Sequence, residues 1–263
     1  MERLISMKHF VQGLILAMQF LTRIPIPIAC PWERQSIKGA LSSFGIVGLI
    51  IGGILALTLS ITDTVFPEWM SALLIVTLWV FLTGGLHLDG LMDVADAVGS
   101  NAPLEKKLVI MKDPQVGSFA VLTAIFHLVW KVAFIYGFLT YPDMELQLLL
   151  FCVILIPACS RLIPLFLLYY VPVMKQEGLA YQWKQHISVR EVFIGTAIVF
   201  IYTLLYPYMF LIFLSYFVYF FFIRIWILKN FKGINGDILG ASIEGGELWG
   251  LFILWMYTWF VMG

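Results

Sequence analysis

Long apolar stretches alternate with short polar connections along most of this chain. A helix needs about 20 mostly apolar residues to cross a bilayer. The spacing of the apolar stretches predicts seven membrane-spanning helices and an all-α polytopic membrane protein, with residues 1–263 forming a single integral-membrane domain. The expected spans are residues 41–61, 69–87, 118–139, 146–171, 192–206, 208–228 and 247–262.

A further apolar run near the start, residues 10–21, is too short to span a membrane comfortably, and Pro25 and Pro27 follow it. We expect a short re-entrant or interfacial helix there. The run lies between Lys8 and Arg23 without a small-residue cleavage site, so the pattern does not indicate a cleavable signal peptide.

The composition supports a membrane protein and excludes a soluble domain. Hydrophobic residues make up 61% of the chain and charged residues only 12%, whereas soluble domains carry about 25% charged residues. The mean hydropathy is +0.95. The formal net charge is zero, and we expect a lipid bilayer and no nucleic acid as partner. The cysteines have no metal or redox spacing and are expected to be packing residues: Cys30, Cys152 and Cys159.

Basic residues fall on one side of the expected membrane. The connections around Asp63 and Asp143, and the turn at Pro207, contain no Lys or Arg. Because cytoplasmic loops are enriched in Lys and Arg, we expect the basic connections and the N-terminus in the cytoplasm and the C-terminus outside. The basic residues of these connections are Arg23, Arg34, Lys38, Lys106, Lys107, Lys112, Lys175, Lys184, Arg190, Lys229 and Lys232.

The most informative segment lies where the second expected span reaches this basic side. Asp89, Asp93 and Asp96 follow within residues 83–97 and fall within about 60° of one another on one helical face. Their mutual repulsion is relieved by a divalent cation, and hard oxygen ligands suit Mg²⁺ or Mn²⁺. The alternative is a solvated helix start whose acids complement the helix dipole, which accounts for Asp89 and not for Asp96.

Two other polar clusters are expected at the same membrane face. One covers residues 111–118 and contains Lys112 and Asp113, and the other covers residues 233–244 and contains several glycines. Glycine permits tight turns and close approach of the backbone to a ligand. The second cluster is equally consistent with a functional loop and with a simple connection.

Two cations fall inside expected spans. Arg161 lies between Pro157 and Pro164 in the fourth span, and Lys131 lies in the third. A cation in lipid is expensive unless it is paired, so each indicates a functional group or an ion pair. Arg161 lies about 15 Å from the cytoplasmic end of its span, deep enough to form the floor of a cavity. The alternative is that Arg161 pairs with an acid and holds the bundle together.

The histidines carry less information. His87 lies two residues before Asp89 and is either a catalytic group or a satisfied polar residue. His9, His127 and His186 stand alone in the sequence and are interpreted as structural.

Acids, a metal and cations at a cytoplasmic membrane face suit phosphoryl transfer, which depends on positioning and on neutralising phosphate charge. A carboxylate could also act as the base for an attacking hydroxyl. The residues alone therefore indicate a metal-dependent membrane enzyme that acts on a phosphate ester or a diphosphate.

The segment TGGLHLDGL at residues 83–91, followed by Asp93 and Asp96, resembles the signature of the cobalamin synthases, the adenosylcobinamide-GDP ribazoletransferases. The resemblance covers nearly the whole chain. The departures are Pro114-Gln115 in place of a small polar residue and an arginine, Asn235 in place of threonine, and Met92 and Val94 in place of smaller or polar residues. The other similar motifs are residues 20–25, 44–52, 111–113, 116–119, 161–164, 177–179 and 236–241.

The resemblance implies that a ribose hydroxyl of α-ribazole, or of its 5′-phosphate, attacks the cobinamide-side phosphorus of adenosylcobinamide-GDP and that GMP leaves. It implies Mg²⁺ as cofactor, the bacterial inner membrane as location, a cytoplasmic active site, and a homo-oligomer or other cobalamin-assembly enzymes as further partners. The implied metal ligands are Asp89, Asp93, Asp96 and Asp113. The implied catalytic residues are His87, Asp89, Asp93, Lys112 and Asp237, and the implied substrate-binding residues are Gly84, Gly85, Lys112, Arg161, Asn235, Asp237 and Glu244.

Two other functions compete with this one. A phospholipid-synthesising transferase of the CDP-alcohol type also places aspartates on a helix, but its motif pairs Asp-x-x-Asp-Gly with an Ala-Arg that this chain lacks. A cation-coupled transporter could use Asp89, Asp93, Lys131 and Arg161 as a coupling path. Transporters often contain internal repeats with sites at the membrane midplane, and the sequence shows no repeat.

Overall fold

The structure, a computed structural model, describes the backbone of residues 2–262 and the side chains of residues 7–261. Over this part of the chain it consists of α-helices and one short π-helix, which confirms the all-α prediction. The helices are α1 (Glu2–Leu21), α2 (Arg34–Val65), α3 (Glu68–Thr83), α4 (Leu86–Gly99), α5 (Leu104–Ile110), α6 (Ser118–Thr140), α7 (Leu146–Tyr170), α8 (Gly178–Lys184), α9 (Val189–Thr203), α10 (Pro207–Asn230), α11 (Gly236–Tyr257) and η1 (Thr258–Met262).

Several helices are long and apolar enough to cross a membrane. By length and composition α2, α6, α7, α10 and the helix that begins with α11 qualify alone, and the number reaches seven if each of two bent pairs is one span. In these pairs α3 meets α4 at 90° and α8 meets α9 at 96°. The prediction of a multi-pass membrane protein is therefore confirmed.

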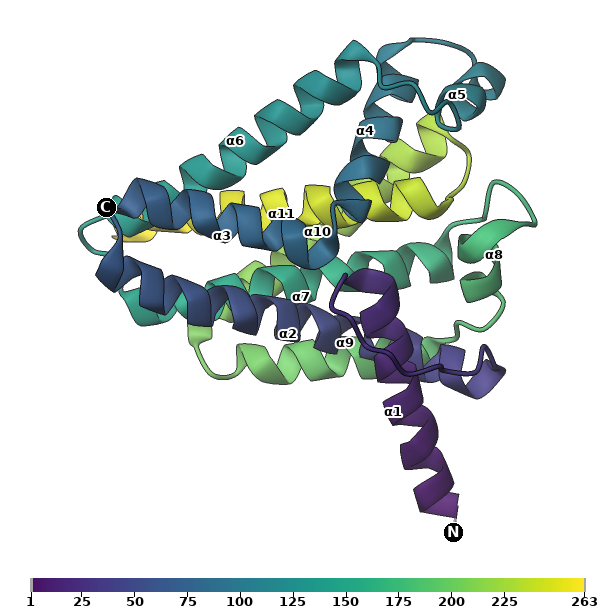
Figure 1. Ribbon diagram of the computed structural model, residues 1–263, viewed down its shortest axis with the longest axis horizontal. Coiled ribbons are helices and arrows are strands. Elements are labelled where there is room, and N and C mark those ends of the chain that lie inside the picture. The colour runs from purple at the N-terminus through teal and green to yellow at the C-terminus, as the bar shows by residue number, and fades with distance from the viewer. Residues whose placement is uncertain (1, 263) are drawn as a thin grey trace.

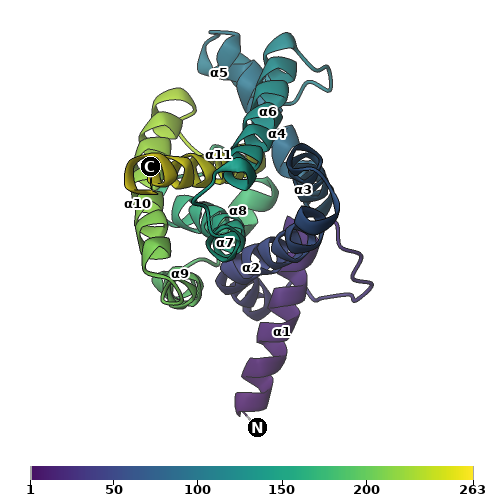
Figure 2. The same cartoon turned by 90° about the vertical axis from the view of Figure 1, so that its left-hand side faces the viewer.

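The short α-helices gather at one end of the bundle. Figure 1 shows α2, α3, α7 and α11 running along a common direction, with α4 turned across one end. Helices α5 and α8 lie at this same end, and the C-terminal end of the chain lies at the opposite one. We call the end that carries α4, α5 and α8 the polar end, since the acidic motif lies on α4. Both views show α1 at a steep angle to the long helices, with its N-terminal part projecting from the body (Figures 1 and 2).

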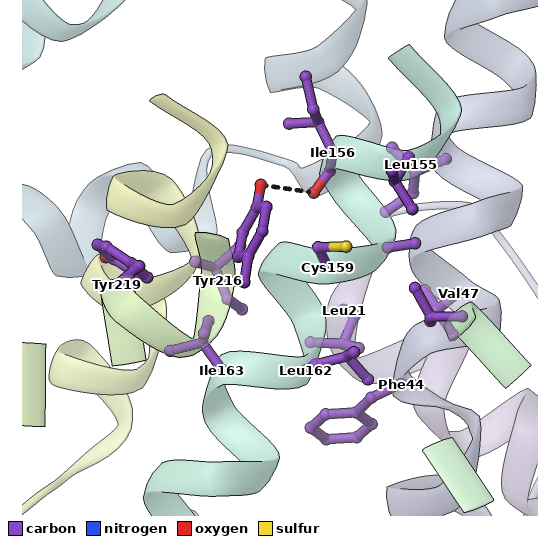
Figure 3. Close-up of a cluster of buried hydrophobic side chains, with 14 of the residues drawn as sticks. Leu21, Phe44, Val47, Leu155, Ile156, Cys159, Leu162, Ile163, Tyr216 and Tyr219 are labelled. Carbon is purple, nitrogen blue, oxygen red and sulfur yellow. Dashed lines mark hydrogen bonds between the residues drawn. The ribbon is translucent and has the colours of Figure 1, made fainter. Parts of the chain in front are cut away.

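The core surrounds α7, most of which is buried. Helix α2 packs closely against it because Gly48 and Gly52 face its backbone; a Cβ atom built on Gly48 would lie 2.4 Å from the Cα of Ala158. Figure 3 shows buried side chains from both helices and from α1 and α10 meeting around Cys159. Cys152 and Cys159 are fully buried there, as expected of packing residues, and Cys30 is half-buried.

A turn of two glycines sets the direction of α4. Gly84 and Gly85 have φ angles of 64° and 68°, in the left-handed region that L side chains rarely adopt. The segment after α1 covers this turn, since the Arg23 amide donates to the Leu82 carbonyl at 2.8 Å. A Cβ atom on Gly84 would overlap the Arg23 side chain, at 1.9 Å from its Cγ. These contacts fix α4 across the end of the bundle.

The largest difference from the predicted bounds lies at the start of the last span. Helix α11 begins at Gly236, so the cluster at residues 233–244 is mostly helix, and the expectation that the last span begins at residue 247 is wrong. Asn235 is the N-cap, and its side-chain oxygen accepts from the Ile238 amide at 2.9 Å. Ile238 and Ile243 are buried. Of the glycines that suggested a connection, Gly240 permits close packing against α4, and Gly233 faces the loop after α7.

Candidate functional site

The acidic helix packs directly on the first turns of α11. A Cβ atom on Gly90 would lie 2.7 Å from the carbonyl oxygen of Asp237, and one on Gly240 would lie 3.3 Å from the Cα of His87. A glycine on each helix therefore lets the two backbones approach. Since Asp89 flanks Gly90 in the sequence, the crossing brings the acidic motif to Asp237.

The carboxylates at this crossing repel one another. Helix α4 lies across the polar end, and Asp93 is half-buried there, beyond residue 87, where the second expected span ends. Burial, and then the negative charges of Asp237, Asp89 and Asp96 in that order, raise the pKa of Asp93 to about 6. The predicted clustering of the aspartates is therefore present, and Asp237 joins them. A bound cation would offset this repulsion.

Asp96 has a structural role that the sequence did not reveal. Its carboxylate oxygens accept from the backbone amides of Gly117 at 2.6 Å and Ala120 at 2.8 Å, at the N-terminus of α6. The first amides of a helix have no partner within the helix, and a carboxylate there satisfies them and complements the helix dipole. Asp96 therefore ties α6 to α4. Metal coordination by Asp96 stays a prediction.

The donor set at the crossing suits a magnesium ion that also contacts substrate. Among the side chains that the structure describes, no group of three Asp, Glu, His or Cys residues stands ready to enclose an ion. Mg²⁺ is usually held by one or two carboxylates with phosphate oxygens and water, so a preformed cage is not required. Asp89, Asp93 and Asp237 supply oxygen donors of this kind. Asp113 is exposed and accepts from the Gln115 amide at 2.9 Å, and its part in metal binding also stays a prediction.

Two adjoining cavities open beside the carboxylates. One has a volume of about 200 Å³, and its mainly apolar wall includes His87, Asp89 and Asp237. The other has a volume of about 290 Å³ and is lined in part by the polar residues Lys112 and Asn235. They share three lining residues: Leu179, Ala180 and Gly236. The carboxylates therefore lie next to an apolar chamber, and a more polar chamber is its neighbour.

The loops around the polar chamber are tied together by backbone hydrogen bonds. The Met174 amide donates to the Ile234 carbonyl at 3.0 Å, and the Ile234 amide donates to the Pro172 carbonyl at 2.9 Å. Asn235, the next residue, donates from its side-chain nitrogen to Asp237 at 2.7 Å. Asn235 therefore caps α11 and orients a carboxylate of the site.

A network of buried charges lies deeper in the bundle. Glu244 accepts from Lys131 at 2.6 Å and contacts His127 at 2.7 Å. Glu247 pairs with both Lys131 and Arg161. Lys131 also lies 4.8 Å from the ring centroid of Trp79, a cation–π contact. All five charged or titratable members are buried, on α6, α7 and α11: His127, Lys131, Arg161, Glu244 and Glu247.

This network gives protein partners to two residues that the resemblance implies as substrate contacts, and contact of either with substrate stays a prediction. Arg161 and Glu244 are not among the residues that line either cavity, and their partners are protein side chains. The alternative prediction, that Arg161 pairs with an acid inside the bundle, is confirmed. Glu247 was missed as a partner. The signal was its position three residues after Glu244, which places both acids on one helical face opposite two buried cations.

Gly90 offers a test of the helix crossing. We expect Gly90→Ala to lower activity strongly and to destabilise the protein by about 1–3 kcal/mol, because its methyl group would push the α4 and α11 backbones apart. The matched control is Gly137→Ala in α6, where nothing lies within 4 Å of an added Cβ atom. Activity assays and thermal unfolding in detergent measure both effects. Equal behaviour of the two variants would contradict the close crossing.

Residues 13–255 match the family model described as cobalamin-5-phosphate synthase. An adenosylcobinamide-GDP ribazoletransferase of Halalkalibacterium halodurans is 36% identical over 95% of this chain and 98% of its own length. Proteins of the same name from Acinetobacter baumannii (36% identity, 88% of this chain and 92% of theirs) and Geobacillus sp. (32%, 97% and 100%) are also similar. No solved structure matches. The chain therefore belongs to the cobalamin-5-phosphate synthase family.

Proposed function

We propose that this protein is a transferase that joins adenosylcobinamide-GDP to α-ribazole or α-ribazole 5′-phosphate and releases GMP. The names of its full-length relatives support this reaction. The observation that carries it in the structure is the meeting of Asp89 and Asp93 with Asp237 beside two cavities. One acidic site flanked by two chambers suits the joining of two substrates at a diphosphate.

The reaction exchanges a phosphoanhydride bond for a phosphoester bond. The oxygen of a ribose hydroxyl forms a bond to the cobinamide-side phosphorus, the bond from that phosphorus to the bridging oxygen breaks, and GMP departs with that oxygen. A carboxylate of the acidic site accepts the hydroxyl proton. Mg²⁺, held by Asp89, Asp93 and the substrate, would neutralise the diphosphate charge.

Residues outside the carboxylate group contribute charge and shape. Lys112 lines the polar chamber and is exposed, so its ammonium group is free to neutralise phosphate or the departing GMP. The Gly84–Gly85 turn directs α4 across the bundle, and thereby positions the acids. His87 is buried against α11, so we assign it a part in shaping the site.

We place the active site at the cytoplasmic face of a bacterial inner membrane. The polar end of the bundle carries α5 and α8, whose lysines lie in the connections predicted to be cytoplasmic. Assembly into a homo-oligomer, or with other cobalamin-assembly enzymes, stays a prediction.

The test is an assay of the purified protein in detergent with adenosylcobinamide-GDP, α-ribazole and Mg²⁺. We expect release of one GMP for each cobalamin formed, and loss of both products after complete chelation of divalent cations. Phospholipid synthesis from a CDP-alcohol, or substrate uptake into proteoliposomes without GMP release, would contradict the proposal and favour the two competing functions.

A further inference from the structure

We propose that the apolar cavity beside Asp89 and Asp237 binds the bicyclic aromatic base of the ribazole substrate. This inference rests on the proposed function and adds a subsite to it. The cavity is lined by residues of α1, α2, α4, α7, α8 and the first turns of α11. Its volume is about 200 Å³. For comparison, an apolar cavity of about 150 Å³ binds a benzene ring, so the size suits one small aromatic ring system.

The wall of this cavity is aromatic. The ring of Trp183 lies with its centroid 5.2 Å from that of Phe20 and 5.5 Å from that of Phe44. All three residues line the cavity, and Trp183 and Phe44 are each 1% exposed. Aromatic rings pack favourably edge-to-face or offset at such separations, and a flat heterocycle would extend this cluster by one ring.

Two residues that line the cavity each carry a buried polar atom without a partner. The two atoms are Nε1 of Trp183 and Nδ1 of His87. A buried donor or acceptor without a partner is unfavourable, so such atoms indicate a ligand or an ordered water. A benzimidazole-type base carries one free ring nitrogen that accepts a hydrogen bond, which the indole N–H of Trp183 can donate.

The same features disfavour the other base of the reaction. Guanine carries several donors and acceptors, and most of them would remain unpaired against a wall of phenylalanine, tryptophan and leucine side chains. The neighbouring chamber, with Lys112, Lys175 and Asn235 in its wall, suits a nucleotide better. A base in the apolar cavity would also present its ribose to the carboxylates at the cavity wall, where the hydroxyl must react.

The structure holds Trp183 firmly in place. Lys184, the next residue, donates to the carbonyl oxygens of Leu168 at 2.7 Å and Val171 at 2.8 Å, at the C-terminal end of α7. These bonds satisfy carbonyl groups that have no partner within α7, and they fix α8 over the cavity. The ring of Trp183 is therefore positioned before the substrate arrives, which favours binding.

The test compares two ribosides, one with a benzimidazole base and one with an indole base, in which carbon replaces the accepting nitrogen. The wild type should have a higher kcat/KM for GMP release with the benzimidazole riboside than with the indole riboside. It should also bind the benzimidazole riboside more tightly at equilibrium when adenosylcobinamide-GDP is absent. Trp183→Phe keeps an apolar ring and removes the N–H donor. We expect this variant to bind the benzimidazole riboside about three- to tenfold more weakly, to lose its preference over indole, and to keep its KM for adenosylcobinamide-GDP.

Two further variants separate the loss of one hydrogen bond from a general loss of packing. Phe44→Leu should weaken binding of both ribosides without changing their ratio, and the matched control Trp69→Phe, on the exposed face of α3, should change nothing. An active Trp183→Phe enzyme with an unchanged preference would overturn the subsite alone. A wild type that releases no GMP with either riboside would overturn the proposed function and the subsite together.

Discussion

Glu247→Ala is expected to destabilise the protein by about 3–5 kcal/mol, the range for removing one partner of a buried ion pair. Glu247 is fully buried and pairs with both Lys131 and Arg161, which are buried as well. Its loss would leave Arg161 without its carboxylate partner, and Nε and Nη2 of this guanidinium already have none. The uncompensated charge, more than the lost attraction, produces the effect.

The matched control is Glu177→Ala. Glu177 forms an exposed pair with Lys175 at 3.9 Å, and its side chain is 69% exposed. Exposed pairs contribute about 0–1 kcal/mol, so this variant should unfold close to the wild type. Thermal and denaturant unfolding in the same detergent compares the two. If Glu247→Ala costs no more than Glu177→Ala, the buried network does not stabilise the bundle as we describe.

Asp89→Asn and Asp93→Asn are each expected to lower kcat/KM by at least about 10²-fold, since loss of a ligand to a charge-neutralising ion removes several kcal/mol of transition-state stabilisation. Their stability should be unchanged or higher. The carboxylates of Asp89 and Asp237 repel Asp93 in the free protein, and the amide side chain removes that repulsion. A large loss of activity without a loss of stability separates these variants from misfolded ones.

The matched control for both is Asp143→Asn, an exposed acid in the connection between α6 and α7. Rates of GMP release should be unaffected by it. Activity of Asp89→Asn or Asp93→Asn near the wild-type level would exclude that residue from the metal site. A fall in stability that parallels the fall in activity would instead indicate a structural carboxylate.

Hydropathy and helical periodicity predicted the parts of the fold that depend on residues close together in the sequence. The order of the spans follows from hydropathy, and the shared face of Asp89, Asp93 and Asp96 follows from the helical period. The start of α11 could not be predicted in this way, because the glycines between residues 233 and 250 resemble a flexible connection. Only their packing against other helices, such as Gly240 against His87 and Gly246 against Ser160, explains why they lie in a helix.

Contacts between residues far apart in the chain could not be predicted from the sequence. Asp96 reaches the N-terminus of α6, and Glu247 reaches Arg161 across a separation of 86 residues. No periodicity encodes which acid meets which cation. The cavity around Trp183 was also not predicted, because it forms where six helices meet, and no single helix supplies the whole wall.

Binding of Mn²⁺, as a paramagnetic substitute for Mg²⁺, tests the central claim most directly. Electron paramagnetic resonance would measure protein-bound Mn²⁺ in the presence of adenosylcobinamide-GDP and without α-ribazole, so that no turnover occurs. We predict tight binding to the wild type and to Asp143→Asn, and its loss in the double variant Asp89→Asn/Asp93→Asn. Equally tight binding to that double variant would contradict a metal site at the crossing of α4 and α11.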